Sequence, residues 1–192
     1  MVKVSPSDSY TINMQSPEPG QNYFELFGLN PVFDIDPALL HAKQQRLQAT
    51  YHPDRHVGSS DQDRLVSVQM ASLINQAYET LRDPVKRSRY LLKINGVSLP
   101  DDSATTSDTV FLMEQIELRE AVEACRNGDE GLQRSEEIAT RLKQRADELA
   151  RDFVADFAAN RVDAAIDSSR KMQFVQRIQQ QLAELQFELE DY

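Results

Sequence analysis

The sequence predicts an all-helical protein with two domains, and three observations support this prediction. Apolar residues recur every three or four positions in several long segments, which is the spacing of a helix with one buried face. Short, glycine-bounded runs that alternate apolar and polar residues, as strands do, are nearly absent. A polar stretch from Leu99 to Ser107 separates two groups of such segments, and 192 residues suffice for two small cores.

The first group of segments predicts a short aromatic helix followed by three others. Asn30-Pro31 closes the short helix, because the residue before a proline disfavours helical geometry. Asp36-Pro37 and Asp83-Pro84 each supply an N-cap and a first-turn proline. Between them, Ser60 and Asp63 form a start that resembles a capping box. The expected helices cover 23–29, 37 to about 51, about 61–82 and 84–92.

The second and third helices are expected to pack antiparallel, each through one apolar face. On the second helix this face holds Leu40, Leu47 and Tyr51. On the third helix the expected apolar face consists of Leu65, Val68, Ala71, Ile74, Tyr78 and Leu81. The tripeptide His52-Pro53-Asp54 ends the second helix as a polar turn, and its proline directs the flanking side chains outward.

The second group predicts three longer helices, for which a three-helix bundle is the economical arrangement. They run from Thr109 to Arg126, from about Gly131 to Ala159 and from Arg161 to Glu190. The buried stripes of the middle and last helices are expected at Leu142, Leu149, Phe153, Phe157, Val175, Ile178, Leu182, Leu185 and Leu189.

The first helix of this bundle carries two apolar faces. At 100° per residue, one set of side chains shares the direction that we assign to the core: Phe111, Leu118, Val122 and Cys125. A second set points almost the opposite way and is interleaved with Glu117 and Glu120: Leu112, Met113 and Ile116. Burying the first set leaves the second outside, as a candidate binding surface, unless the linker or the first domain covers it.

Composition excludes several classes of function. The formal net charge is −10, and residues 101–192 hold 11 basic and 21 acidic side chains, so binding to nucleic acid is disfavoured. No apolar stretch approaches the roughly 20 residues that a membrane span needs. Residues 1–22 match neither a secretory signal nor a transit peptide and are expected to form a flexible tail.

The single cysteine, Cys125, leaves no disulfide framework and no set of thiolates for zinc or an iron–sulfur cluster. We therefore expect no metal, no cofactor and a reducing, cytoplasmic location. Because Cys125 lies on the predicted core stripe, we interpret it as a small buried hydrophobic residue and not as a reactive thiol.

Four motifs follow one another along the first domain: Tyr23-Phe24-Glu25-Leu26-Phe27-Gly28-Leu29, Tyr51-His52-Pro53-Asp54-Arg55, Ile74 to Pro84, and Arg87-Ser88-Arg89-Tyr90. In this order they resemble the J domain of DnaJ-type co-chaperones, two antiparallel helices with the His-Pro-Asp turn at their tip. The resemblance implies docking on an ATP-bound DnaK-type chaperone and stimulation of its ATP hydrolysis. His52, Pro53 and Asp54 would contact that chaperone, and the chain itself would perform no chemistry.

Lys43 and Arg46, three positions apart on the second helix, would present a basic side to an acidic groove of the chaperone, with His41 and Gln45 nearby. J domains often carry more lysines on this helix, so docking would depend more strongly on the turn. The two basic side chains are also compatible with an ordinary solvated face.

The stretch Phe111-Leu112-Met113-Glu114-Gln115-Ile116-Glu117-Leu118-Arg119-Glu120 closely resembles the start of the C-terminal domain of the HscB family. These J-type co-chaperones are dedicated to iron–sulfur cluster assembly. In the family, this domain binds the cluster scaffold protein and delivers it to the specialised chaperone HscA. The scaffold-binding set carried over by position is Leu112, Met113, Ile116, Glu117, Glu120 and Phe174.

Two of these positions need comment. Ile116 replaces the leucine expected from the family pattern, which is a mild change. Phe174 lies on the flank of the stripe on the last helix, so it is either partly exposed or an ordinary core residue.

With both resemblances combined, the expected organisation is a flexible tail over 1–22, a J domain over 23–95, a linker over 96–108 and a scaffold-binding domain over 109–192. The glycine/phenylalanine-rich linker and cysteine-rich modules of general DnaJ proteins are missing from the sequence. A cysteine-based N-terminal extension, found in some organellar family members, is missing as well. The chain therefore resembles the simpler bacterial form.

Two alternatives belong to other classes of function. A metal-dependent hydrolase could use His52, Asp54 and His56 with His41, but the proline inside the run and the lack of an enclosed pocket argue against it. The nearer alternative is a J-domain adaptor that recruits a DnaK-type chaperone to a different client. The exposed Leu112, Met113 and Ile116 surface favours the cluster scaffold protein over such a client.

Overall fold

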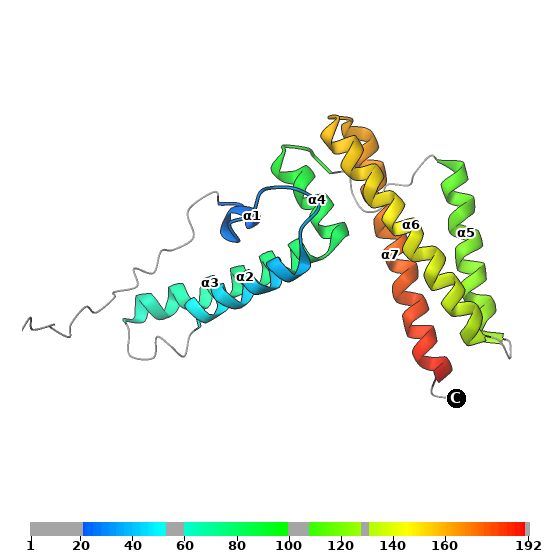
Figure 1. Cartoon of the computed structure of the whole chain (residues 1–192), viewed down its shortest axis with the longest axis horizontal. Coiled ribbons are helices and arrows are strands. Elements are labelled where there is room, and N and C mark those ends of the chain that lie inside the picture. The colour runs from blue at the N-terminus through cyan, green and yellow to red at the C-terminus, as the bar shows by residue number, and fades with distance from the viewer. Residues whose placement is uncertain (1–20, 53–59, 100–107, 128–130, 191–192) are drawn as a thin grey trace, which may run out of the picture. The chain divides into compact units, whose positions relative to one another are not determined.

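The computed structural model describes residues 21–52, 60–99, 108–127 and 131–190, and within them the chain is helical without a β-strand (Figure 1). The expected all-helical class is confirmed. Most of the predicted tail over 1–22 and most of the linker over 96–108 lie outside these ranges. The helices are α1 (Tyr23–Leu26), α2 (Pro37–Thr50), α3 (Asp61–Arg82), α4 (Pro84–Ile94), α5 (Thr109–Ala124), the 3-10 turn η2 (Cys125–Asn127), α6 (Gly131–Ala158) and α7 (Val162–Glu190).

Side-chain caps begin the first two helices: Asp36 was predicted in this role, and Asn22 was not. Asn22 Oδ1 accepts a hydrogen bond from the Glu25 amide at 3.0 Å, and Glu25 Oε2 accepts one from the Asn22 amide at 2.9 Å, so α1 starts with a complete capping box. Asp36 Oδ1 accepts from the Ala38 amide at 2.9 Å at the start of α2. Gly28 ends the α1 region with φ of +56°, a conformation that favours glycine.

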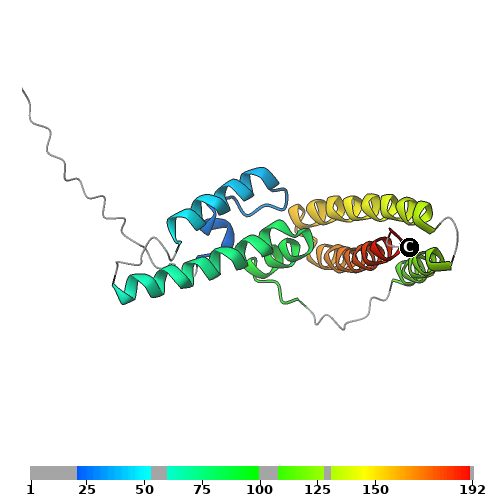
Figure 2. The ribbon, with the colours of Figure 1, turned by 90° about the horizontal axis from the view of Figure 1, so that it is seen from below.

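α2 and α3 lie side by side and form the predicted hairpin (Figures 1 and 2). Polar contacts tie the two helices together along their length. Gln48 Nε2 donates to Asn75 Oδ1 at 2.9 Å, and the Ser67 hydroxyl donates to the Tyr51 carbonyl at 2.8 Å. Because the Ser67 bond joins the end of α2 to the beginning of α3, it fixes the base of the turn that follows Tyr51.

The predicted apolar face of α3 is wrong in its first half. Leu65 and Val68 are 58% and 55% exposed. The helix instead buries Ser67, Met70, Ile74, Ala77 and Leu81. The physical reason is that steps of three residues drift by about 60° each, so the proposed series walked around the helix, whereas alternating steps of three and four keep one face.

The second group of helices forms a bundle in which α6 and α7 run antiparallel along most of their lengths (Figure 2). The predicted stripes are largely confirmed: seven of their nine residues are buried, while Phe157 and Leu189 are half-buried. Gly131 begins α6 where a Cβ atom would lie 2.3 Å from the Cys125 carbonyl oxygen. Only glycine therefore allows the η2 turn to approach α6 so closely.

α4 packs against α7, and three polar contacts accompany this packing. The buried hydroxyls of Ser88 and Ser169 lie 2.7 Å apart, and Gln176 Nε2 donates to Asp83 Oδ2 at 2.9 Å. Arg89 Nη1 also donates to Gln173 Oε1 at 3.5 Å.

The chain accordingly separates into two compact units. One contains the residues up to Pro31 with Ile35–Arg82, and the other contains Val32–Asp34 with the chain from Asp83 onward. This division precedes α4, whereas the expected J domain over 23–95 includes it. Which segment folds independently as the J domain stays a prediction.

Candidate partner-binding surfaces

The first candidate surface is the end of α2, where the predicted turn begins. His52 directly follows Tyr51 and is exposed. Pro53 and Asp54, and His56 of the hydrolase alternative, lie outside the described residues. The backbone before His52 is held by Ser67, which is fully buried and was missed in the sequence analysis. The sequence contains an indication of this burial, because Ser67 precedes Met70, Ile74 and Ala77 at helical spacing.

The basic residues predicted on α2 differ in their surroundings. Arg46 is exposed. Lys43 is half-buried and donates from Nζ to the Gly28 carbonyl at 3.2 Å, so it also ties α2 to the end of the α1 region. His41 forms hydrogen bonds with the Tyr78 hydroxyl at 3.3 Å and the Gln45 amide nitrogen at 3.1 Å. The surface is mostly polar, although Leu39 is 45% exposed on the same helix. Of its two basic side chains, only Arg46 presents its charge without such a tie among the described residues.

The second candidate surface is α5, whose two apolar faces have opposite environments. Phe111, Leu118, Val122 and Cys125 are all buried, which confirms the predicted core face. Met113 is 64% exposed and Ile116 is 57% exposed, while Leu112 is half-buried at the edge. With Val110, which is 76% exposed near the start of α5, three apolar side chains therefore face outward from a helix whose opposite side is anchored in the bundle.

The carboxylates of α5 fall into two groups. Glu114 pairs with Arg145 of α6, and Glu123 pairs with Arg126 at 3.4 Å. Glu117 and Glu120 are exposed and form no ion pair with any described residue. The two carboxylates next to the exposed apolar residues are thus the ones that remain available to a partner.

Two ion pairs hold the N-terminal half of α5 against its neighbours. Arg145 Nε lies 2.9 Å from Glu114 Oε1, and Lys171 Nζ lies 2.7 Å from Asp108 Oδ2, the N-cap of α5. Burial disfavours the charged form of Arg145, but its hydrogen bonds and charge interactions with Glu114 and Glu148 outweigh this effect and raise its pKa. These pairs join different helices, so the sequence pattern gives no signal for them.

Burial and hydrogen bonding also have opposite effects on the pKa of Lys171, in the second ion pair. Burial disfavours the charged form of Lys171, but hydrogen bonds to Asp108 and Asp167 outweigh it and raise the pKa of the amine. The hydrogen bond from Lys171, followed by one from the Phe111 amide, lowers the pKa of Asp108. Both groups are therefore held in their charged forms at neutral pH.

Phe174 is buried, with only 9% of its surface exposed, so the expectation that it could be partly exposed is not met. Its ring packs edge-to-face on Phe111 with centroids 5.6 Å apart. The guanidinium carbon of Arg119 lies 5.4 Å from the Phe174 ring centroid. Phe174 therefore lies between the core and an exposed arginine of α5.

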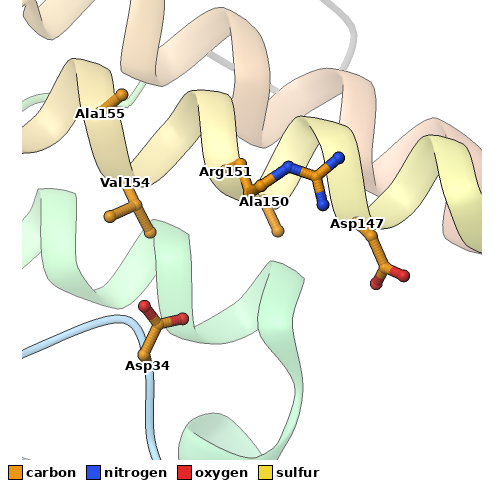
Figure 3. A pocket seen from close by; sticks show the side chains of 6 residues that line it. All are labelled: Asp34, Asp147, Ala150, Arg151, Val154 and Ala155. Carbon is orange, nitrogen blue, oxygen red and sulfur yellow. The ribbon is translucent and has the colours of Figure 1, made fainter.

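One recess of the second compact unit, of about 400 Å³, is lined by Asp34 and by α6 residues between Asp147 and Ala155. Figure 3 shows Asp34 across from these residues, with the Arg151 guanidinium directed along the helix near Asp147. This set lacks a histidine, cysteine or serine nucleophile, and no group of metal-ligating side chains occurs among the described residues. None of the described helices is long and apolar enough to cross a membrane.

Comparison with known proteins identifies the family. A sequence model described as the HSCB C-terminal oligomerisation domain matches residues 107–183. Over 174 residues, the chain is 36% identical to a co-chaperone protein HscB homolog of Shewanella halifaxensis, and this match covers 88% of the chain and 99% of that protein. The chain belongs to the HscB family of co-chaperones.

Solved structures of HscB proteins are similar to this chain. Chaperone HscB from Vibrio cholerae is 34% identical with a TM-score of 0.79, over 88% of this chain and 99% of that one. Human co-chaperone protein HscB is 29% identical with a TM-score of 0.79, over 88% of this chain and 84% of that one. As an HscB-family member, the chain is a non-enzymatic co-chaperone that functions in iron–sulfur cluster assembly with an Hsp70-type chaperone.

Proposed function

We propose that this HscB-family chain couples two specific partners through two separate surfaces. The α2–α3 hairpin stimulates ATP hydrolysis by the DnaK-type chaperone HscA, and α5 binds the iron–sulfur cluster scaffold protein and delivers it to that chaperone. The reducing cytoplasm favoured by the single cysteine is part of this proposal. The observation that carries it is the exposure of Met113 and Ile116 on a helix whose opposite face is buried.

The chaperone-binding residues in this proposal are His52, Pro53 and Asp54, with Lys43 and Arg46 beside them on α2. The exposed position of His52 supports its role, because a side chain outside the core is accessible to a partner. Arg46 contributes an exposed positive charge that accelerates the encounter with an acidic groove. Lys43 contributes less, because its amine already binds the Gly28 carbonyl.

The scaffold-binding residues are Leu112, Met113, Ile116, Glu117, Glu120 and Phe174. Met113 and Ile116 supply the apolar centre, and Glu117 and Glu120 supply a charged margin, which is the usual composition of a specific interface. Leu112 extends the centre toward the bundle. Phe174 supports this face from below, since little of its ring reaches the surface.

The test replaces Leu112, Met113 and Ile116 together with alanine. We expect the affinity for purified scaffold protein, measured by calorimetry, to fall by about 100-fold, because a few apolar anchors supply most of the energy of such interfaces. Stimulation of the HscA ATPase in the absence of scaffold should persist, because these residues lie outside the hairpin.

A matched control replaces Leu132, Phe187 and Val68 with alanine, since these apolar side chains are also exposed but lie on other helices. This variant should bind the scaffold normally. If the α5 variant binds the scaffold with unchanged affinity, α5 is not the scaffold-binding surface, and recruitment of a different client becomes the better hypothesis.

A further inference from the structure

Arg119 occupies a distinctive position on α5. It follows Leu112 by seven residues and therefore lies on nearly the same side of the helix, at the edge of the exposed apolar residues. Its guanidinium carbon is 5.4 Å from the Phe174 ring centroid, and Phe174 in turn packs edge-to-face on Phe111. The three side chains make successive contacts from the core to the surface, where Arg119 places a positive charge.

The charge of Arg119 is not neutralised by its own helix. Arg119 is the only basic residue of α5, and it forms no ion pair with any described residue. Glu123, one turn later, pairs with Arg126 instead, and Glu114 pairs with Arg145. The contact with the Phe174 ring leaves the edges of the planar guanidinium able to donate hydrogen bonds to a partner.

Unpaired charges of both signs consequently border Met113 and Ile116. At 100° per residue, Glu117 borders Met113 on one side and Arg119 borders Ile116 on the other. Glu120 points between these two apolar side chains, one turn further along the helix. A surface with a single sign of charge accepts a partner in several registers, whereas a surface with opposite signs at defined positions penalises any shift that brings like charges together. Arginine is also enriched among the residues that dominate interface energies.

We propose that Arg119 is a specificity-determining residue of the scaffold-binding surface and that it binds a carboxylate of the scaffold protein. Phe174 is a positioning residue in this arrangement. Its ring lies against the guanidinium of Arg119 and holds that group at the surface, where the partner contacts it. This inference rests on the proposed function of α5 and deepens it. It also accounts for a family binding position that is almost fully buried in this chain.

The first experiment measures the affinity of Arg119→Gln and Arg119→Lys for purified scaffold protein over a range of salt concentrations. We expect Arg119→Gln to bind about tenfold more weakly and with a smaller salt dependence, because an ion pair across the interface is lost. Arg119→Lys should be intermediate, since it keeps the charge but loses the planar group. The matched control is Arg177→Gln, an exposed arginine of α7, which should bind as the unaltered chain does.

The second experiment tests the positioning role of Phe174 with a double-mutant cycle. Phe174→Leu should lower the affinity about threefold when Arg119 is present and should have almost no effect in the Arg119→Gln background. Thermal unfolding of each variant verifies that the bundle is folded. A merely structural role of Phe174 would lower the affinity equally in both backgrounds.

Three results would overturn the inference: an affinity of Arg119→Gln within twofold of the unaltered chain, tighter binding by that variant, or equal effects of Phe174→Leu in both backgrounds. Tighter binding would mean that Arg119 only covers Phe174 and competes with the scaffold. The proposed function is judged separately, by the Leu112, Met113 and Ile116 variant. If that variant has lost binding and Arg119→Gln has not, only the role of Arg119 is refuted.

Discussion

α2 and α5 each carry a candidate partner-binding surface, but the two helices are built differently. α2 buries only Leu40, and its outer side carries Arg46 and a hydrogen-bonded group around His41. α5 buries three residues within the helix and exposes Met113 and Ile116 beside unpaired carboxylates. The α2 surface is mostly polar, with Leu39 45% exposed on the side of Lys43 and Arg46. The α5 surface has an apolar centre with a charged margin.

This difference indicates how each surface works. Polar and charged contacts mainly accelerate and orient an encounter, while desolvated apolar anchors determine how long a complex lasts. In the proposed function, the chain leaves the ATPase after each cycle but keeps the scaffold protein bound until transfer. The polar α2 surface suits the first requirement, and the α5 surface suits the second.

The sharpest way to test this separation is His52→Gln, for which we expect the largest effect. Stimulation of the chaperone's single-turnover ATP hydrolysis should fall by more than about tenfold, because His52 is exposed and a few side chains usually supply most of the energy of an interface. Scaffold affinity and the thermal unfolding midpoint should remain unchanged, since His52 lies outside the core. Normal stimulation by this variant would show that His52 has no part in docking.

A smaller effect is expected from the ion pair that holds α5 to α6. Arg145→Met should lower scaffold affinity about threefold and the free energy of unfolding by about 1 kcal/mol, because both partners of the Arg145–Glu114 pair are only partly exposed. Arg141→Met is the matched control, since Arg141 is exposed and lies one turn earlier on α6.

Two further variants, Glu114→Gln alone and Glu114→Gln combined with Arg145→Met, complete a double-mutant cycle. If the pair positions α5, the double variant should be no weaker in scaffold binding than either single variant. Additive losses would show instead that Arg145 and Glu114 act independently, and the hypothesis that their ion pair positions α5 would be wrong.

Much of the fold was predictable because local signals and packing agree. Asp36 and Asp83 were predicted as N-caps from the sequence, and each caps a helix in the structure. The core face of α5 was also predicted, since Phe111, Leu118 and Val122 share one direction at 100° per residue. In both cases, residues close in sequence contain the whole signal.

What could not be predicted depends on contacts between segments far apart in the sequence. The burial of Phe174 is set by Phe111 and Arg119 on another helix, and the Glu114–Arg145 pair joins α5 to α6. The packing of α4 on α7 has the same origin, because Ser88 and Ser169 meet only in the folded chain. The apolar face predicted for α3 was wrong for a different reason. Because Ser67 occupies the start of the buried face, the apolar series was begun at Leu65 and Val68, and its three-residue steps drifted around the helix.

The smallest effect is expected from replacing Ser67. Ser67 is fully buried and donates to the carbonyl of Tyr51, the residue before His52. Ser67→Ala removes the donor and leaves that carbonyl without this partner, so we expect the free energy of unfolding to fall by about 1 kcal/mol. ATPase stimulation should fall two- to threefold, because the base of the turn gains freedom, while scaffold affinity should not change.

Ser72→Ala is the matched control, since Ser72 lies on the same helix but is exposed. The informative measurement is the stimulation at saturating co-chaperone, where a fully folded population removes the contribution of stability. Reduced stimulation under this condition would show that the hairpin depends on an ordered tip, whereas full stimulation would show that the tip orders only upon docking. In the second case the α2 surface would not need an ordered tip before docking, whereas the α5 surface is held in place by its ion pairs before a partner binds.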